Sequence, residues 1–161
     1  MIPSFTISKK DRLYIGKQFH SNGYWLVSDT LMKTGRAPKA LKVLDTLKPG
    51  SYLDGYGNGL SRDDTPDMAA IIPTREGYSL CPSQPIGVEF RGRGDFDEII
   101  AYKYQGNGFV FGVAPKYVPL LRTGYIFAKE ATTPLLVLSG ETLNDDLFAV
   151  VMPIRLIKEE S

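Results

Sequence analysis

Short runs of β-branched and aromatic residues recur along the chain and are separated by Gly, Pro, Asn and Asp. Runs of this length with turn residues between them predict a mainly antiparallel sheet protein. Asn22-Gly23 and Asn107-Gly108 are strong hairpin signals. We expect strands at 5–7, 13–19, 24–27, 78–80, 86–90, 99–104, 109–113, 125–129, 135–138 and 147–154.

Two segments have helical rather than alternating spacing, and both open on Ala-Pro-Lys. In 37–47, Pro38 suits the first helical turn, where its missing N–H costs nothing. The apolar face there holds Ala40, Val43, Leu44 and Leu47, with Leu41 at its edge and with Lys39, Lys42 and Thr46 opposite. In 114–122, Pro119 predicts a short or kinked helix. Its inward residues are Tyr117, Val118, Leu120 and Leu121, and Lys116 and Arg122 lie on the other side.

The two halves of the chain resemble each other, because an Asn-Gly turn precedes an Ala-Pro-Lys helix start in both. This predicts a weak internal duplication within one α+β domain spanning 1–161. A stretch at about 50–77 is rich in Gly, Pro and Asp and is expected to be a long loop or insertion, with only 68–72 able to form regular structure.

The run Val150-Val151-Met152-Pro153-Ile154-Arg155-Leu156 closes the last expected strand. It resembles the C-terminal signature of the bacterial DNA polymerase III β subunit, the sliding clamp. The resemblance extends from residue 99 onward. Val113-Ala114-Pro115-Lys116-Tyr117-Val118 is similar to a helix start in the third domain of that family, and 133–137 resembles its penultimate strand.

The resemblance implies a fold and a function. The fold would be α+β, a DNA-clamp-like single domain of two pseudo-symmetric half-domains, each with a short helix packed on antiparallel strands. The function would be non-catalytic, as a processivity factor or clamp accessory in DNA replication or repair, with the chain as a homo-oligomer. Family chains carry three such domains, whereas this sequence has room for one.

The resemblance also implies two binding surfaces. Double-stranded DNA would meet the helices without sequence preference, through Lys39, Lys42, Lys116 and Arg122. Replication proteins that carry clamp-binding peptides would meet Val150, Val151, Met152, Pro153, Ile154 and Arg155. Ile154 replaces a methionine of the family, the second wall of the family's pocket comes from a domain that this sequence lacks, and 157–161 could cover the pocket.

Charge is distributed unevenly, although the net charge is only +1. Residues 1–50 hold nine Lys and Arg against three Asp, and the rest hold ten basic against fifteen acidic residues. A basic segment of this kind suits contact with phosphate. The alternative is a solvated surface without a ligand.

Candidate catalytic chemistry is sparse. With one histidine, His20, and one cysteine, Cys81, the chain cannot supply a two-histidine zinc site or an internal disulfide. We expect His20 to be a turn residue and Cys81 a small buried hydrophobe. Asp63, Asp64 and Asp67 lack EF-hand spacing and are expected in a solvated loop.

We therefore expect neither an enzyme nor a bound cofactor or metal. No apolar run is long enough for a membrane span, and 1–5 do not open a signal peptide, so a cytoplasmic location without membrane partners is expected. Two alternatives to the clamp accessory stay open. One is a clamp-domain mimic or interaction module, phage-encoded for example, that sequesters a replication protein without encircling DNA. The other is an unrelated α+β domain.

Overall fold

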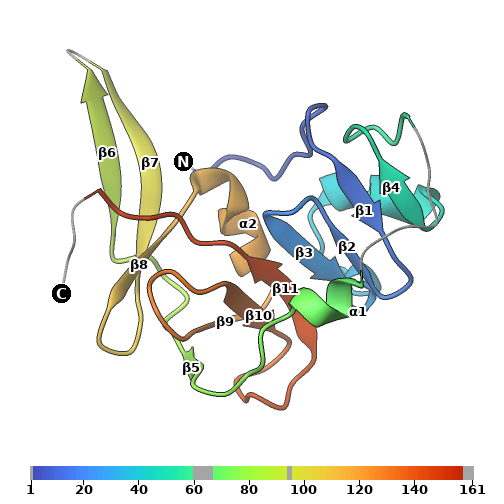
Figure 1. Cartoon of the computed structure of the whole chain (residues 1–161). Helices are drawn as coiled ribbons and strands as arrows, with labels where there is room; N and C mark the ends of the chain where they lie inside the picture. Colours follow the sequence, from blue (N-terminus) through green and yellow to red (C-terminus); the bar gives the residue numbers. More distant parts are fainter. Residues whose placement is uncertain (1, 60–66, 94–95, 158–161) are drawn as a thin grey trace.

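The computed structural model describes residues 2–59, 67–93 and 96–157, and within them the fold is α+β, with mainly antiparallel sheets and a few short helices (Figure 1). The elements of the first half are β1 (Leu13–Ile15), β2 (Phe19–Ser21), β3 (Trp25–Ser28), α1 (Asp29–Met32), the 3₁₀ helix η1 (Lys39–Thr46), β4 (Gly50–Tyr52) and the 3₁₀ helix η2 (Met68–Ile71). Those of the second half are β5 (Ser79–Leu80), β6 (Gly87–Arg93), β7 (Phe96–Gln105), β8 (Val110–Val113), the 3₁₀ helix η3 (Pro115–Tyr117), α2 (Val118–Leu121), β9 (Tyr125–Ala128), β10 (Leu135–Leu138) and β11 (Leu147–Val151).

One large sheet organises the molecule. Among the described residues it has eight strands in the order β4-β1-β2-β3-β11-β10-β9-β5. Four strands from the first half of the chain therefore lie beside four from the second half. The halves meet at an antiparallel seam, where Leu26 of β3 is opposite Val150 of β11.

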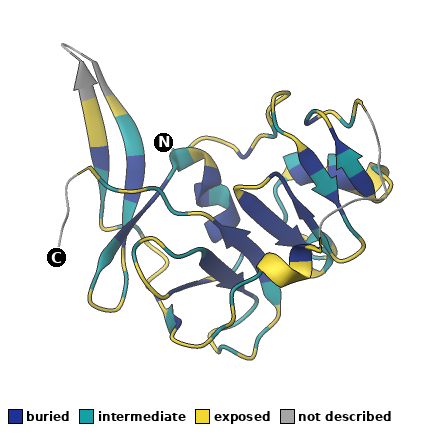
Figure 2. Cartoon of the chain, viewed as in Figure 1, coloured by how far each residue is buried: buried dark blue, intermediate teal, exposed yellow. Residues whose placement is uncertain are grey.

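The two faces of this sheet are covered differently. On one face, β-strand side chains such as Val27 and Val137 pack with η1, α2 and the β6-β7-β8 sheet in the larger core. On the other face, Leu26, Leu136 and Val150 form a smaller core, with Met68 of η2 and Tyr78 as cover. Figure 2 shows the strands of the large sheet as the buried centre of the chain, with exposed residues on the turns.

The β6-β7 hairpin extends away from the rest of the chain (Figure 1). At its base, Tyr102 and Tyr104 of β7 and Phe111 of β8 enter the larger core, and the rings of Tyr104 and Phe111 stack with centroids 5.5 Å apart. After β11, the chain runs along β8, where the Ile154 amide donates to the Gly112 carbonyl oxygen at 2.9 Å.

The first predicted helix is present, but it is the 3₁₀ helix η1 and it is shorter than the expected 37–47. Three residues per turn place Leu41 and Leu44 in one row, and both are fully buried. The apolar spacing thus satisfies the 3₁₀ period better than the α period. Lys39 and Lys42 are exposed, as expected.

The second helical segment is short, as its proline predicts. Pro119 lies in the first turn of α2, where its missing N–H leaves no intrahelical bond unmade. The four predicted inward residues are all buried: Tyr117, Val118, Leu120 and Leu121.

Several local predictions need correction. The run 13–19 is two strands, because Gly16 makes a tight turn in which its amide donates to the Phe19 carbonyl oxygen at 2.9 Å. Residues 5–7 form no strand, although Phe5 is buried with its ring edge-on to Trp25. α1 was not predicted; its signal is Ser28, whose hydroxyl oxygen accepts from the Leu31 amide as an N-cap.

The two Asn-Gly turns occupy different places in the fold. The Asn22-Gly23 turn joins β2 and β3 in the large sheet, whereas the Asn107-Gly108 turn joins β7 and β8 in the smaller one. In addition, η1 follows three strands of its half, whereas α2 precedes three strands of the other half. The repeated sequence pattern therefore does not mark equivalent positions.

Candidate functional site: an apolar groove beside the C-terminal strand

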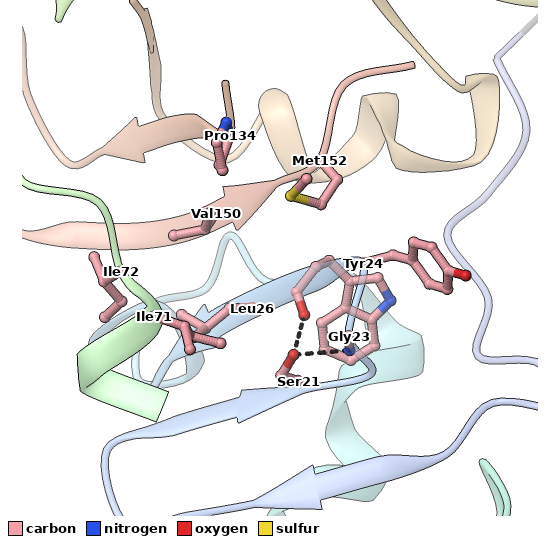
Figure 3. A pocket seen from close by; sticks show the side chains of 10 residues that line it. Ser21, Gly23, Tyr24, Leu26, Ile71, Ile72, Pro134, Val150 and Met152 are labelled. Carbon is pink, nitrogen blue, oxygen red and sulfur yellow. Dashed lines mark hydrogen bonds between the residues drawn. The ribbon is translucent and has the colours of Figure 1, made fainter. Parts of the chain in front are cut away.

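An apolar groove with a volume of about 220 Å³ opens on the thinly covered face of the large sheet (Figure 3). Its floor lies at the seam, where Leu26 of β3 and Val150 of β11 project to the same side. The groove is lined by Ser21, Gly23, Tyr24, Trp25, Leu26, Ile71, Ile72, Pro134, Val150 and Met152.

Strand pairing fixes the position of Met152. β11 ends at Val151, but the Met152 amide donates to the Tyr24 carbonyl oxygen at 3.0 Å, so the pairing with β3 continues one residue further. Successive strand residues point to opposite faces. Val151 therefore enters the larger core, whereas Met152 lies over the groove with 37% of its side chain exposed.

The β2–β3 turn forms the polar rim of the groove and satisfies its own hydrogen bonds. The Asn22 side-chain oxygen accepts from the Tyr24 and Trp25 amides at 2.9 and 3.0 Å. The Ser21 hydroxyl donates to the Trp25 carbonyl oxygen and accepts from the Gly23 amide (Figure 3). With these groups paired internally, the groove offers a ligand mainly apolar contact, and the lining residues named above include no Asp, Glu, His, Lys or Arg.

The opposite wall comes from η2. Asp67 caps this helix by accepting from the Ala69 amide at 3.2 Å, and buried Met68 anchors it to the sheet. Ile71 is 61% exposed and Ile72 is half-buried, and both line the groove. Figure 3 shows them facing Val150 and Leu26, while the Tyr24 ring extends away along the rim.

The structure divides the six predicted peptide-binding residues. Val150 and Met152 line the groove, Val151 is buried on the other face, and Pro153, Ile154 and Arg155 lie beyond it where the chain turns toward β8. The Ile157 amide donates to a Glu89 carboxylate oxygen at 3.0 Å, so this part of the tail lies along the smaller sheet instead of over the groove. The rest of the tail, 158–161, is outside the described residues.

Tyr24, Leu26 and the η2 isoleucines were missed as groove residues in the sequence. The available signal was the pair Ile71-Ile72, an apolar step inside a polar, glycine-rich stretch. The 3₁₀ helix η2 confirms regular structure at 68–71, but the prediction that nothing else between 50 and 77 would be regular is wrong, because β4 covers Gly50–Tyr52.

The four predicted DNA-binding residues are all exposed: Lys39, Lys42, Lys116 and Arg122. Because η1 and the η3–α2 segment bury their apolar sides in the same larger core, both turn their basic sides outward from the same face of the large sheet. Lys116 lies over the Tyr117 ring, 5.1 Å from its centroid. Arg122 is the C-cap of α2, where a cation is electrostatically favourable.

His20 is a buried residue of β2, so its assignment to the turn is wrong. Burial lowers the pKa of its imidazole, against the opposing effect of Asp29 and Asp45. Cys81 is buried as expected, and burial raises the pKa of its thiol, which keeps the nucleophilic thiolate scarce. Among the described residues, the Cys81 thiol donates to the Ser79 carbonyl oxygen, and no hydrogen-bond partner is present for the His20 Nδ1 atom.

Within the described ranges, no group of three or more His, Cys, Asp or Glu side chains is arranged to hold a metal ion. Asp67 is used as a helix cap, and Asp63 and Asp64 fall outside those ranges. In the same part of the chain, no helix has the length and apolar character that a membrane span requires.

No protein-family model, curated protein or solved structure matches this chain.

Proposed function

We propose that this chain is a non-catalytic, clamp-like accessory protein of DNA replication or repair. One observation carries the proposal: η1 and the η3–α2 segment cover the same face of a single antiparallel sheet. A clamp-like domain requires this arrangement, since its helices must face DNA together. Helices on opposite faces would have ruled it out.

In this proposal, the four strands on each side of the β3–β11 seam correspond to the two half-domains of a clamp domain. The C-terminal Val-Val-Met-Pro-Ile-Arg-Leu run supports the correspondence. The different chain order of helix and strands in the two halves argues against a simple duplication, so the proposed symmetry is one of arrangement in space.

The DNA contact would be electrostatic. Lys39 and Lys42 on η1, with Lys116 and Arg122 on the other segment, would attract backbone phosphates without reading bases. A protein that moves along DNA needs contacts of this kind, because base-specific hydrogen bonds would hold it at one sequence.

A salt titration of duplex binding tests this contact. Each phosphate contact that is lost should flatten the plot of log affinity against log salt by about 0.9. Lys39→Ala/Lys42→Ala should therefore have a shallower slope than the parent chain, whereas Lys129→Ala, an exposed lysine after β9, should not. Equal slopes for the double variant and the parent chain would show that Lys39 and Lys42 do not contact the DNA phosphates. No duplex binding at low salt would contradict the DNA role.

The groove would receive a short peptide from a replication protein. Its apolar floor and the partly exposed Met152 suit aliphatic or aromatic side chains, and the flexible thioether adapts to their shapes. Ile71 and Ile72 would replace the wall that the clamp family takes from another domain. This would allow a single domain to hold the peptide.

Fluorescence anisotropy with a labelled clamp-binding peptide from a bacterial replicative polymerase tests the groove. Met152→Ala and Ile71→Ala should each weaken binding, because both side chains line the groove. Ile154→Ala is the matched control, since that residue pairs with Gly112 outside the groove. Loss of affinity in the control alone, or no binding by the parent chain, would contradict the assignment.

The completeness of the groove favours a second candidate function. Because both walls come from one chain, a clamp-domain mimic could bind a replication protein without forming a ring. Solution mass separates the two. A ring of single-domain copies is a closed oligomer of several chains, whereas a mimic is expected as a monomer or dimer that binds peptide and not duplex DNA.

A further inference from the structure

Two exposed turns from distant parts of the sequence lie against each other at one end of the large sheet. One covers 8–11, before β1, and the other covers 53–58, after β4. The Gly55 amide donates to the Lys9 carbonyl oxygen at 3.4 Å. A Cβ atom at Gly55 would lie 2.1 Å from the Ser8 carbonyl oxygen, so only glycine permits this approach.

Each turn is fixed by its own hydrogen bonds. The Ser8 amide donates to the Asp11 carboxylate and the Asp11 amide donates back to the Ser8 carbonyl oxygen, at 3.1 and 3.0 Å. In the second turn, one Asp54 carboxylate oxygen accepts from the Asn58 and Tyr56 amides, both at 3.0 Å. The Asn58 amide contributes most to lowering the pKa of Asp54, so this carboxylate stays ionised and is occupied by the backbone.

This pair of turns carries an exposed tyrosine and two exposed lysines, together with the carboxylates of Asp11 and Asp54, the second of which interacts electrostatically with Lys9. Tyr56 is 61% exposed, although its backbone is held by Asp54. Lys9 and Lys10, at the tip of the first turn, are exposed as well. Because the Tyr56 backbone is already held, this exposed residue loses less conformational entropy on binding a flat ligand.

The Tyr56 turn packs at the end of η1. Gly57 packs against Leu47, which directly follows η1, and a Cβ there would lie 2.6 Å from a Leu47 methyl carbon. Lys39 and Lys42 project from the same helix. The Tyr56 turn therefore lies at the end of the helix that carries these two lysines.

We propose that the paired turns bind single-stranded DNA, with the Tyr56 ring stacked on an unpaired base and with Lys9 and Lys10 contacting the flanking phosphates. The inference rests on the proposed DNA role and extends it from duplex to single strand. Stacking on an aromatic side chain is sequence-tolerant and requires a base whose face is accessible, which a duplex does not offer. The protein would then contact duplex through η1 and unpaired nucleotides through Tyr56, as at a junction between the two.

An anionic membrane is the competing class of ligand, since it also attracts basic residues. Binding to a membrane surface takes a wide apolar face or a lipid anchor in addition to charge. The exposed apolar side chains of this turn, Tyr56 and Leu53, form a smaller surface than that. The observations therefore favour a nucleic acid.

Binding of a labelled oligothymidylate, compared with the same strand in a duplex, tests the proposal. Tyr56→Ala should lower affinity for the single strand at least about five-fold, whereas Tyr56→Phe, which keeps the ring, should stay within about two-fold. Tyr125→Ala is the matched control, because Tyr125 is an exposed tyrosine on β9 in the distant part of the sheet. Lys9→Ala/Lys10→Ala should flatten the salt dependence for the single strand.

Duplex affinity is measured in parallel and should change less than about two-fold in Tyr56→Ala, which separates this inference from the η1 contact. If duplex binding persists but Tyr56→Ala binds oligothymidylate as well as the parent chain, the inference is overturned and the proposed function stands. If the chain binds neither oligothymidylate nor duplex, both the inference and the proposed function are contradicted. Binding to phosphatidylserine vesicles without binding to oligothymidylate would overturn the inference in favour of a membrane ligand. Because Tyr56 is exposed, thermal melts should show all variants folded.

Discussion

The two faces of the eight-stranded sheet have the same backbone but different surroundings. One face is covered by η1, α2 and the base of the smaller sheet, and its core residues include Leu41, Leu120 and Phe111, all at 0% exposure. The other face has η2 and a few loop residues as cover, and the groove remains open beside Met152. Among the described residues, the covered face contributes most of the buried apolar surface, and the thinly covered face keeps apolar surface accessible.

This difference suggests a division of roles between the faces. Apolar side chains that are not needed to close the core can contact a partner, and on this sheet they lie around Met152 and Ile71. Substitutions on the covered face should therefore change stability, and substitutions around the groove should change binding. Four predictions test that division, from the largest expected effect to the smallest.

Leu120→Ala should give the largest loss of stability. The side chain is fully buried in the larger core, so the change leaves a cavity and should lower the free energy of unfolding by about 2–5 kcal/mol. Ile72→Ala, a half-buried residue of the groove wall, should cost clearly less in the same urea titration. Equal losses would show that the two faces contribute alike.

Arg75→Ala should have an intermediate effect on stability, because Arg75 links the segment after η2 to the turn before β11 on the thinly covered face. Its guanidinium donates to the Leu143 and Asp145 carbonyl oxygens in the turn that precedes β11. Losing hydrogen bonds from a charged donor should cost about 1.5–3 kcal/mol, and less where water replaces them. Arg12→Ala, on an exposed side chain, should stay within about 0.5 kcal/mol, measured by chemical denaturation. If Arg75→Ala lowers the free energy of unfolding no more than Arg12→Ala, the turn before β11 is stable without the Arg75 hydrogen bonds.

Val151, the last residue of β11, and Met152, which follows it, allow the sharpest comparison between the faces. Met152→Ala should cost about 1 kcal/mol, below the range for fully buried methionines, because the side chain is 37% exposed. Val151→Ala should cost more although it removes fewer atoms, since Val151 is at 0% exposure in the larger core. Thermal melts of the two variants measure the order. The reverse order would place Met152 in the core and argue against the groove as a binding surface.

The smallest expected effect is a pH dependence from His20. Because burial lowers the pKa of His20 in the folded chain, the unfolded chain takes up the proton first as the pH falls. Stability should therefore be constant above the ordinary value of 6.5 and should decrease as the pH falls from there toward the folded pKa. Urea titrations from neutral to mildly acidic pH measure this slope, which His20→Leu should remove. An unchanged slope in that variant would assign the dependence to carboxylates.

Local patterns predicted most elements of the fold, because strands and helix starts depend on nearby residues. The apolar spacing around Leu44 and Leu120 identified both helical segments, and it identified the buried side of the second. In the first, Leu41 was expected at the edge of the apolar face but is fully buried. The type of the first helix was missed, since leucines three apart also fit a 3₁₀ turn. His20 was misplaced because a residue before an Asn-Gly turn can still belong to the strand.

The groove was only half predictable. Val150 and Met152 were found through the C-terminal run, but their neighbours in space come from residues far away in the sequence. Ile71 reaches the groove because η2 is anchored through Met68, and no local pattern specifies which strand an anchored loop will cover. Contacts of that kind depend on tertiary packing and cannot be predicted from the spacing of apolar residues along the sequence.

The seam between β3 and β11 has a consequence for how the chain acquires its structure. The partners at the centre of the sheet are separated by most of the sequence, with Val27 opposite Ala149. The edge of β3 that pairs with β11 therefore stays unpaired until β11 has been synthesised. Closing so long a loop also slows folding. During that interval the open edge is a site for aggregation. Survival of nascent chains should thus depend on how quickly the last strand emerges from the ribosome, which makes the speed of late translation a determinant of yield.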